Sequence, residues 1–301
     1  MKVSTSLFFD RASQQMVAGQ QRLNQVQMQL ATGKKINNAS DEPEQASTLR
    51  RLSTTIAQQE SYRRNLSGLT ERLENQDTAL QNVSSMMIRL RELSIQYANG
   101  TLSAEQRRIA AIEVRGVRDQ ILSLANSRDS NGLGLFNGSR VLADAFDASG
   151  VYQGDQTSNE VPVGDSRAVS NRRSGSDVYT SVIRNTAGTD QAIGFFQVID
   201  DLASALETND TSEVQRGIGE LNQLHQGISL AQAVVGSDLN VVESQSSVID
   251  EQLVRLKGLE SDLQDVDYAE AVTRMQKQLL TLEAAQNSFA KLSRLSLFEY
   301  I

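Results

Sequence analysis

Residues that could carry out chemistry are few and widely separated in this chain. His225 is the only histidine among 301 residues, and there is no cysteine. A metal centre, or a nucleophile with its base, needs several such groups together, so no catalytic, cofactor or metal site is expected. The carboxylate pairs Asp200–Asp201 and Asp265/Asp267 are better explained as helix caps and solvated faces. His225 lies within an expected helix and is predicted to be a surface residue.

A glycine-rich segment, residues 131–138, superficially resembles a phosphate-binding loop. It reads Asn-Gly-Leu-Gly-Leu-Phe-Asn-Gly, and because no Gly-Lys-Ser/Thr follows, a turn is predicted instead. A basic cluster follows it: Arg167, Arg172, Arg173 and Arg184. These arginines are expected to form ion pairs within the chain or with a neighbouring subunit. The net charge is −8, which disfavours nucleic acid and anionic membrane surfaces as partners.

The strongest pattern is a stripe of apolar residues near each terminus, with members three and four positions apart. The first stripe consists of Phe9, Ala12, Met16, Gly19, Leu23, Val26 and Leu30. The second consists of Val272, Met275, Leu279, Leu282, Gln286 and Phe289, followed by Leu292, Leu295 and Phe298. A helix cannot bury such a stripe alone, so each needs a partner helix. Assembly is therefore the leading hypothesis for function.

Most of the apolar members of both stripes are predicted to form the assembly interface. These are Phe9, Met16, Leu23, Val26, Leu30, Val272, Met275, Leu279, Leu282, Phe289, Leu295 and Phe298. Gly19 and Gln286 interrupt the stripes and are interpreted as devices for register or close approach. The alternative, that both stripes pack on the chain's own core, is less favoured because they lie at both extremities.

Helix signals indicate how the stripes are positioned. The first helix is predicted over residues 5–32, with Gly33 supplying the left-handed stop. Asp41, three positions before Glu44, predicts a capping box that opens a second helix. This helix keeps a three-four apolar rhythm and ends at Asn99-Gly100.

The amino-acid composition changes in the middle of the chain. Ser103 and Gln106 form a capping-box pattern, so a third helix follows a short link as an antiparallel hairpin. Residues 126–190 are rich in Ser, Gly, Asn and Asp, with short β-prone segments between turn signals, which predicts an inserted β-containing module. Helical pattern returns over residues 191–206 and again from a cap at Asp210.

A last cap, Asp267 three positions before Glu270, opens the terminal helix. We therefore predict a mainly α fold: a long helical coiled-coil rod with both termini paired at one end and a small β-containing module inserted at the other. The predicted domains are a terminal assembly domain of residues 1–42 and 265–301, a helical rod of residues 43–130 and 191–264, and a β-rich outer module of residues 131–190.

Several runs, in order and spacing, resemble the bacterial flagellin family. They are Leu30–Ile36 with Ala39–Pro43, Leu90–Ser94 with Ala98–Thr101, Val266–Ala271, Leu282–Lys291 and Leu295–Ile301. Within the family, the ending Leu-Ser-Leu-Phe-Glu-Tyr-Ile and the Tyr152–Asp155 run are similar to subunits of the junction between hook and filament. Residues 64–68 lack the Asn-Ala-Asn-Asp-Gly sequence that is common in filament flagellins.

This resemblance implies a non-enzymatic structural subunit, used in motility, that forms a junction ring by terminal coiled-coil assembly. It implies as partners other copies of the chain, a neighbouring hook-associated junction protein, flagellin and an export chaperone that holds the C-terminal segment. It also implies an extracellular flagellar location reached by type III export, with terminal helices that order only on assembly. The start of the chain lacks the apolar core of a cleavable signal, which agrees with such a route.

Two alternatives stay open. A divergent filament flagellin would share the Arg-Glu-Leu and Asp-Tyr-Ala elements, and would be present in far more copies per flagellum. A soluble coiled-coil binding or signalling module would use the same heptads as a stable dimer.

Overall fold

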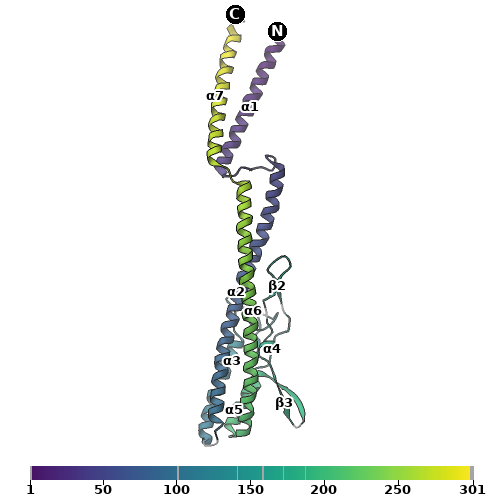
Figure 1. Cartoon of the computed structure of the whole chain (residues 1–301), viewed down its shortest axis with the longest axis vertical. Helices are drawn as coiled ribbons and strands as arrows, with labels where there is room; N and C mark the ends of the chain where they lie inside the picture. The colour runs from purple at the N-terminus through teal and green to yellow at the C-terminus, as the bar shows by residue number, and fades with distance from the viewer. Residues whose placement is uncertain are drawn as a thin grey trace. The chain divides into compact units, whose positions relative to one another are not determined.

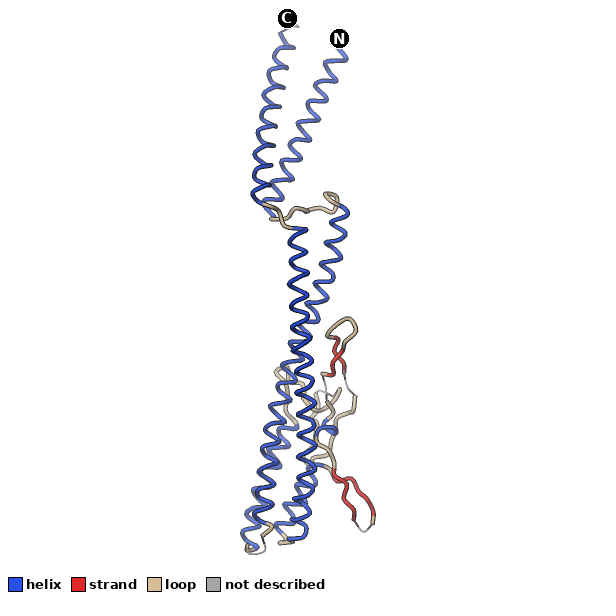
Figure 2. The backbone as a smooth tube through the Cα atoms, in the orientation of Figure 1, coloured by secondary structure: helices blue, strands red, loops and turns tan. Residues whose placement is uncertain are grey.

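The computed structural model describes residues 2–99, 102–140, 142–157, 159–171, 173–186 and 188–298, and α-helix is its main element (Figures 1 and 2). The helices are α1 (Lys2–Thr32), α2 (Pro43–Tyr97), α3 (Ala104–Ala125), α4 (Gly175–Val178), α5 (Phe195–Glu207), α6 (Thr211–Gln264) and α7 (Tyr268–Phe298). The strands are β1 (Glu160–Pro162), β2 (Ala168–Ser170), β3 (Val182–Thr186) and β4 (Thr189–Ile193). The predicted mainly α fold with a small β-containing module is confirmed.

The chain divides into two units. One contains residues 1–58 and 251–301, and the other contains residues 59–250. The first unit holds α1 and α7, which pack against each other. The second holds α3, α4, α5 and the four strands, and the long helices α2 and α6 contribute residues to both units.

In the second unit, α2 buries the apolar rhythm expected from the sequence. The buried residues include Leu66, Leu69, Leu73, Leu80, Val83, Met87 and Leu90. Two polar residues interrupt this face, and both are fully buried with a hydrogen bond. The Gln76 amide donates to the Leu135 carbonyl at 3.1 Å, and the Ser94 hydroxyl donates to the Leu90 carbonyl at 2.6 Å. The Ser94 hydroxyl and the Gln76 amide nitrogen are thus satisfied, whereas the Gln76 side-chain oxygen has no hydrogen-bond partner among the described residues.

Six aromatic rings form the core between the β-containing module and the helices. They are Phe136, Phe146, Tyr152, Tyr179, Phe195 and Phe196. The rings of Phe146 and Phe196 lie 5.2 Å apart, edge to face, and the guanidinium carbon of Arg118 lies 5.6 Å from the Phe196 ring centre. Such contacts add to the burial of apolar area, so this cluster fixes the irregular segments onto the helices.

The strands form two antiparallel hairpins. β1 pairs with β2, and β3 pairs with β4 with Arg184 opposite Gln191. The prediction that a helix begins at Gln191 is therefore wrong, because this residue lies in β4 and α5 begins only at Phe195. A tight turn at Gly188, with φ of 83°, returns the chain onto β3 and commits the segment to a strand.

Ion pairs join the β-containing module to the helices, as expected for the basic cluster. Arg184 donates to both carboxylate oxygens of Glu220, at 2.8 and 2.7 Å, and to Asp201 at 2.6 Å. The hydrogen bond with Glu220 is the main reason that the pKa of Arg184 is raised. Arg173 pairs with Asp238, and Arg167 donates to the Gln245 side chain at 3.2 Å. Arg172 lies outside the described residues.

Most of the predicted caps are present. Ser103 and Gln106 form the expected capping box at the start of α3. The Asp267 carboxylate accepts from the backbone N–H groups of Ala269 and Glu270 at 2.9 and 3.0 Å. Asp41 was expected to cap α2, but its carboxylate accepts from the Asn37 and Asn38 N–H groups and so closes the preceding turn. Asp41 is held in this turn because the N–H groups of the residues just before it donate to its side chain.

We expect acid to destabilise the second unit through its capping carboxylates. Asp210, at the start of α6, accepts from the Ser212 hydroxyl and from the Ser212 and Glu213 N–H groups. The hydrogen bond from the Ser212 hydroxyl is the main reason that the pKa of Asp210 is lowered. A lowered pKa gives stability above the unfolded value, here 3.8, and this stability is lost as the pH falls through the folded value. Thermal unfolding from pH 6 to pH 2 should therefore depend less on pH in Asp210→Asn; an unchanged profile would contradict this role.

Candidate assembly interface

The contact between α1 and α7 is closest beside the segments that lead into these helices (Figure 1). Val26, Val266 and Ala271 form a small buried cluster there. Leu30 and Met275 pack against this cluster and are partly buried. The helices therefore meet first through apolar side chains, as the stripes predicted.

Further from these segments the contact becomes more open. Leu23 is buried, whereas Gly19, Leu282, Phe9 and Phe289 are only partly buried. A β-carbon added to Gly19 would lie 3.6 Å from Leu282 Cδ1, so the glycine receives the leucine side chain. The rings of Phe9 and Phe289 meet edge to face with centres 5.3 Å apart. The contacts between the described parts of α1 and α7 thus continue along both helices, from Leu30 to Phe9 on α1.

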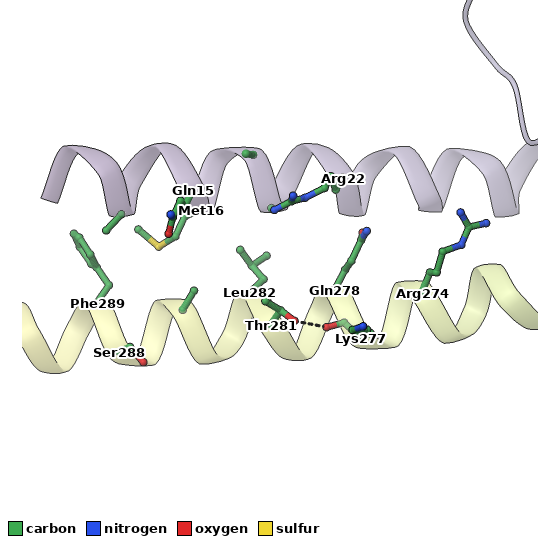
Figure 3. A pocket seen from close by; sticks show the side chains of 14 residues that line it. Gln15, Met16, Arg22, Arg274, Lys277, Gln278, Thr281, Leu282, Ser288 and Phe289 are labelled. Atoms are coloured by element: carbon green, nitrogen blue, oxygen red, sulfur yellow. Dashed lines mark hydrogen bonds between the residues drawn. The ribbon is translucent and has the colours of Figure 1, made fainter. Parts of the chain in front are cut away.

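A groove of about 810 Å³ lies between the two helices along this more open part (Figure 3). Its apolar lining includes Met16, Gly19, Leu282 and Phe289. Three cations also line it: Arg22 from α1, and Arg274 and Lys277 from α7. The groove therefore combines apolar side chains with cations, and no carboxylate is among its described lining residues.

The structure brings together most of the residues predicted for the interface. Four of the five predicted residues of α1 contact α7 or line the groove beside it, namely Phe9, Met16, Val26 and Leu30, and the fifth, Leu23, is buried. On α7, Met275, Leu282 and Phe289 face α1. Val272 and Leu279 belong neither to the buried cluster nor to the groove lining, and 38 % and 36 % of their surfaces are exposed. The side chains of Leu292, Leu295 and Phe298 lie outside the described residues.

The contacting face of α7 has a different phase from the predicted stripe. It passes through Ala271, Met275, Gln278, Leu282 and Ala285 to Phe289, which keeps a four-three spacing. Reasoning from hydrophobicity missed Gln278 and Ala285 because one is polar and the other is small. The four-three spacing back from Phe289 was the signal that could have found them.

Backbone hydrogen bonds tie together the two connectors that enter this helix pair. The Lys35 N–H donates to the Gln264 carbonyl at 2.6 Å, and the Val266 N–H donates to the Gly33 carbonyl at 2.9 Å. The Gln29 side chain donates to the Lys35 carbonyl at 2.7 Å. We call this arrangement the connector clamp. It sets the register in which α1 and α7 begin to pair.

Gly33→Ala should loosen the connector clamp. Gly33 has φ of 71°, and an added β-carbon would lie 2.9 Å from the Tyr268 hydroxyl oxygen. The left-handed backbone alone costs a non-glycine residue on the order of 1 kcal/mol. We expect faster proteolysis within residues 1–42, with unchanged thermal unfolding of residues 59–250. Adding Tyr268→Phe should restore part of the protection by removing the hydroxyl; equal proteolysis of wild type and Gly33→Ala would contradict the clamp.

The described part of the chain contains no group of three or more histidine, cysteine, aspartate or glutamate residues that could hold a metal ion. None of its helices is long and apolar enough to cross a membrane. The glycine-rich segment is a turn in which the Asp129 carboxylate accepts from the Asn131 and Leu133 N–H groups, each at 2.9 Å.

Comparison with known families covers the helices on both sides of this candidate interface. Residues 3–141 match the bacterial flagellin N-terminal helical region, and residues 218–301 match the bacterial flagellin C-terminal helical region. The chain belongs to the bacterial flagellin family. The N-terminal match covers α1 to α3 of this flagellin-family chain, and the C-terminal match covers α7 and most of α6. All four strands lie between the two matched ranges.

Curated relatives of this flagellin-family chain include two kinds of flagellar protein. It is 26 % identical to flagellar hook-associated protein 3 of Salmonella typhimurium, with 99 % of each chain covered. It is 23 % identical to the flagellin of Listeria innocua, covering 98 % of this chain and 95 % of the relative. Both relatives carry the names of structural flagellar proteins.

Two solved structures show the same fold. A putative flagellar hook-associated protein from Vibrio parahaemolyticus superposes with a TM-score of 0.67 at 22 % identity, covering 75 % of this chain and all of that one. FlgL from Xanthomonas campestris superposes with a TM-score of 0.63 at 21 % identity, covering 70 % and 99 %. This flagellin-family chain therefore shares their fold.

Proposed function

We propose that this chain is a structural subunit of the bacterial flagellum that joins hook-side components to the filament. The observation that carries the proposal is the similarity to hook-associated protein 3, which extends over 99 % of both chains. The paired terminal helices support it, because they offer an apolar and partly open surface at which subunits can join. The function depends on geometry, and we propose no catalysis and no cofactor.

Assembly is proposed to run through the terminal helices. The predicted interface residues, including Leu279 and Val272 on the exposed side of α7, would meet neighbouring copies in a ring. The other proposed partners are a neighbouring hook-associated protein, flagellin and an export chaperone that holds the C-terminal segment. We further propose that the chain is exported through the flagellar type III pathway and acts outside the cell.

Deletion of the gene tests this function. We expect the deletion strain to build hooks, to lack filaments and to release flagellin into the medium, because filament subunits would have no surface on which to polymerise. Electron microscopy of the cells and immunoblots of the medium measure both effects. Complementation with the intact gene is the control, and filaments of normal number in the deletion strain would contradict the proposal.

A divergent filament flagellin is the second candidate, and the similarity to Listeria flagellin over 98 % of this chain favours it. The number of copies per flagellum separates the two. A junction subunit is present in few copies, whereas a filament subunit is present in very many. Sedimentation tests the remaining alternative, a soluble coiled-coil module. Such a module would be a dimer joined through residues 1–40 and resistant to protease.

A further inference from the structure

Four glycines lie inside long helices of the second unit, at positions where the fold does not require a glycine. Each is several residues from either end of its helix, and none has a positive φ. Apart from its chain neighbours and its own helix backbone, a β-carbon added to any of them would meet no described atom within 4 Å. We call these residues the open glycines, and they are Gly68 in α2, Gly116 in α3, and Gly219 and Gly236 in α6.

Two further glycines of α6 are needed for packing, and they show what the open glycines lack. A β-carbon at Gly227 would lie 2.6 Å from the Thr180 hydroxyl oxygen, and one at Gly217 would lie 3.1 Å from Leu202 Cδ1. The close approach of α5, and of the segment before β3, therefore explains both glycines. Among the described residues, no such neighbour offsets the cost of an open glycine.

An open glycine lowers the stability of its helix. Glycine loses more backbone freedom on folding than alanine does, and it has no side chain that could add a contact. Replacing one such glycine by alanine is expected to reduce the equilibrium constant for unfolding roughly two- to fivefold. The four sites lie on three helices and share no contact partner, so their effects should multiply.

The sequence of α6 gives this helix little other support. Residues 221–237 contain no aspartate, glutamate, lysine or arginine, so ion pairs between successive turns are excluded there. The Ser229 hydroxyl donates to the His225 carbonyl at 3.0 Å, a contact that slightly weakens a helix. Packing of one face holds this stretch instead, since its buried residues recur three and four positions apart: Leu221, Leu224, Ile228, Ala231 and Val235.

We propose that the open glycines hold the second unit below the stability that its packing could provide, so that the folded unit is unfolded readily before export. The proposal rests on the proposed function, because it concerns how a folded subunit enters the export pathway proposed above. A channel narrower than the folded unit admits only unfolded chain, so a helix that resists unfolding delays passage. The open glycines weaken the helices without altering their buried faces, and the folded structure is therefore kept.

Close approach of a neighbouring subunit is the rival explanation for glycines on a helix surface, and their placement on α6 disfavours it. At about 100° per residue, the spacing between Gly219 and Gly236 puts them roughly 100° apart around the helix. One neighbouring helix that lies along α6 would therefore not use both. Weakening of the helix needs no common face, because it acts through the backbone.

Alanine at all four open glycines tests the proposal in the full chain. The fourfold variant is Gly68→Ala/Gly116→Ala/Gly219→Ala/Gly236→Ala, and the matched control is Gly227→Ala on α6. Denaturant unfolding of the purified chain, followed by circular dichroism at equilibrium and by stopped flow, measures stability and the unfolding rate. Immunoblots of cells, medium and detached flagella measure the exported fraction in the deletion strain, with each variant expressed at the same level.

We expect the unfolding constant of the fourfold variant to be smaller than that of the wild type by about tenfold or more. Its exported fraction should fall roughly threefold or more, because slower unfolding then limits passage. Gly227→Ala should instead unfold faster, since its β-carbon collides with Thr180, and should be exported no less than the wild type. Adding Phe196→Ala to the fourfold variant destabilises the same unit from its aromatic core and should restore export.

Three results would overturn the proposal: unchanged unfolding of the fourfold variant, slower unfolding with the exported fraction of the wild type, or export that stays low after Phe196→Ala is added. Loss of filament attachment by a fourfold variant that is exported normally would assign the open glycines to a contact with a neighbouring subunit. These results are separate from the deletion strain's phenotype. Normal filaments in that strain would reject the proposed function itself, whereas normal export of the fourfold variant would reject only this role of the glycines.

Discussion

Leu282→Asp should abolish filament attachment while leaving residues 59–250 folded. Leu282 lines the groove between α1 and α7 and lies beside Gly19. The substitution removes an apolar contact that is worth about 2 kcal/mol when a leucine is fully buried, and it places a carboxylate beside apolar side chains, where it is costly. In a ring the loss is repeated in every subunit. Electron microscopy of cells that express the variant measures attachment, and calorimetry of the purified chain measures unfolding.

Leu280→Asp is the matched control on the same helix. Leu280 lies two positions away, and 70 % of its surface is exposed. The same chemical change there removes little buried area, so filaments should form in normal number. Loss of attachment in both variants would contradict the assignment of the α1-facing side, and a large fall in unfolding temperature with Leu282→Asp would contradict the separation of the two units.

Phe196→Ala should destabilise residues 59–250 more than any surface change. The Phe196 ring is 1 % exposed and lies 5.2 Å from Phe146 and 5.3 Å from Phe195, measured between ring centres. Truncation of a buried phenylalanine costs about 3–5 kcal/mol because it loses apolar burial and leaves a cavity. Denaturant unfolding followed by circular dichroism measures the loss, which should appear as a lower midpoint with an unchanged slope.

Tyr179→Phe in the same cluster should behave differently. The Tyr179 side chain is 4 % exposed, and the described residues offer its hydroxyl no hydrogen-bond partner. Burial also raises the pKa of this hydroxyl, since the charged form is poorly solvated there. Removing the hydroxyl relieves an unsatisfied polar group, so the variant should be as stable as the wild type or more stable by about 1–2 kcal/mol. Destabilisation equal to that of Phe196→Ala would show that the hydroxyl has a partner.

Features that depend on neighbouring residues in the sequence could be predicted well. The end of α1 at Gly33 and the cap at Asp267 follow from local backbone chemistry. The stripe on α1 could also be predicted, because all its members share one face. Asp41 is the exception, since its carboxylate had two sets of N–H groups within reach and the turn is closer to it.

Features that depend on distant residues could not be predicted. The sequence offers Val272 and Leu279 as an apolar face of α7, but the residues that pack on α1 include Ala271 and Leu282, which lie beside them on the helix. The ion pair of Arg184 with Glu220 joins β3 to α6, and no local pattern marks it. The basic character of the groove could not be predicted either, because it arises from cations on two separate helices.

The junction role came from resemblance, and physical reasoning from the residues reached only assembly through terminal helices. The stripes and the absence of cysteine fit many coiled-coil proteins equally well. A junction subunit differs from a filament subunit in the proteins that it contacts. The packing within a single chain does not reveal those proteins.

We expect the connector clamp to close late in folding. It joins Gly33 to Val266, about 230 residues apart, so closing it from a random coil costs considerable chain entropy and is slow. Once residues 59–250 have folded, the intervening chain no longer samples open conformations and most of that entropy has already been spent. The helix pair should therefore be the last part to form and the first to open, which leaves it available to respond to whatever the subunit meets.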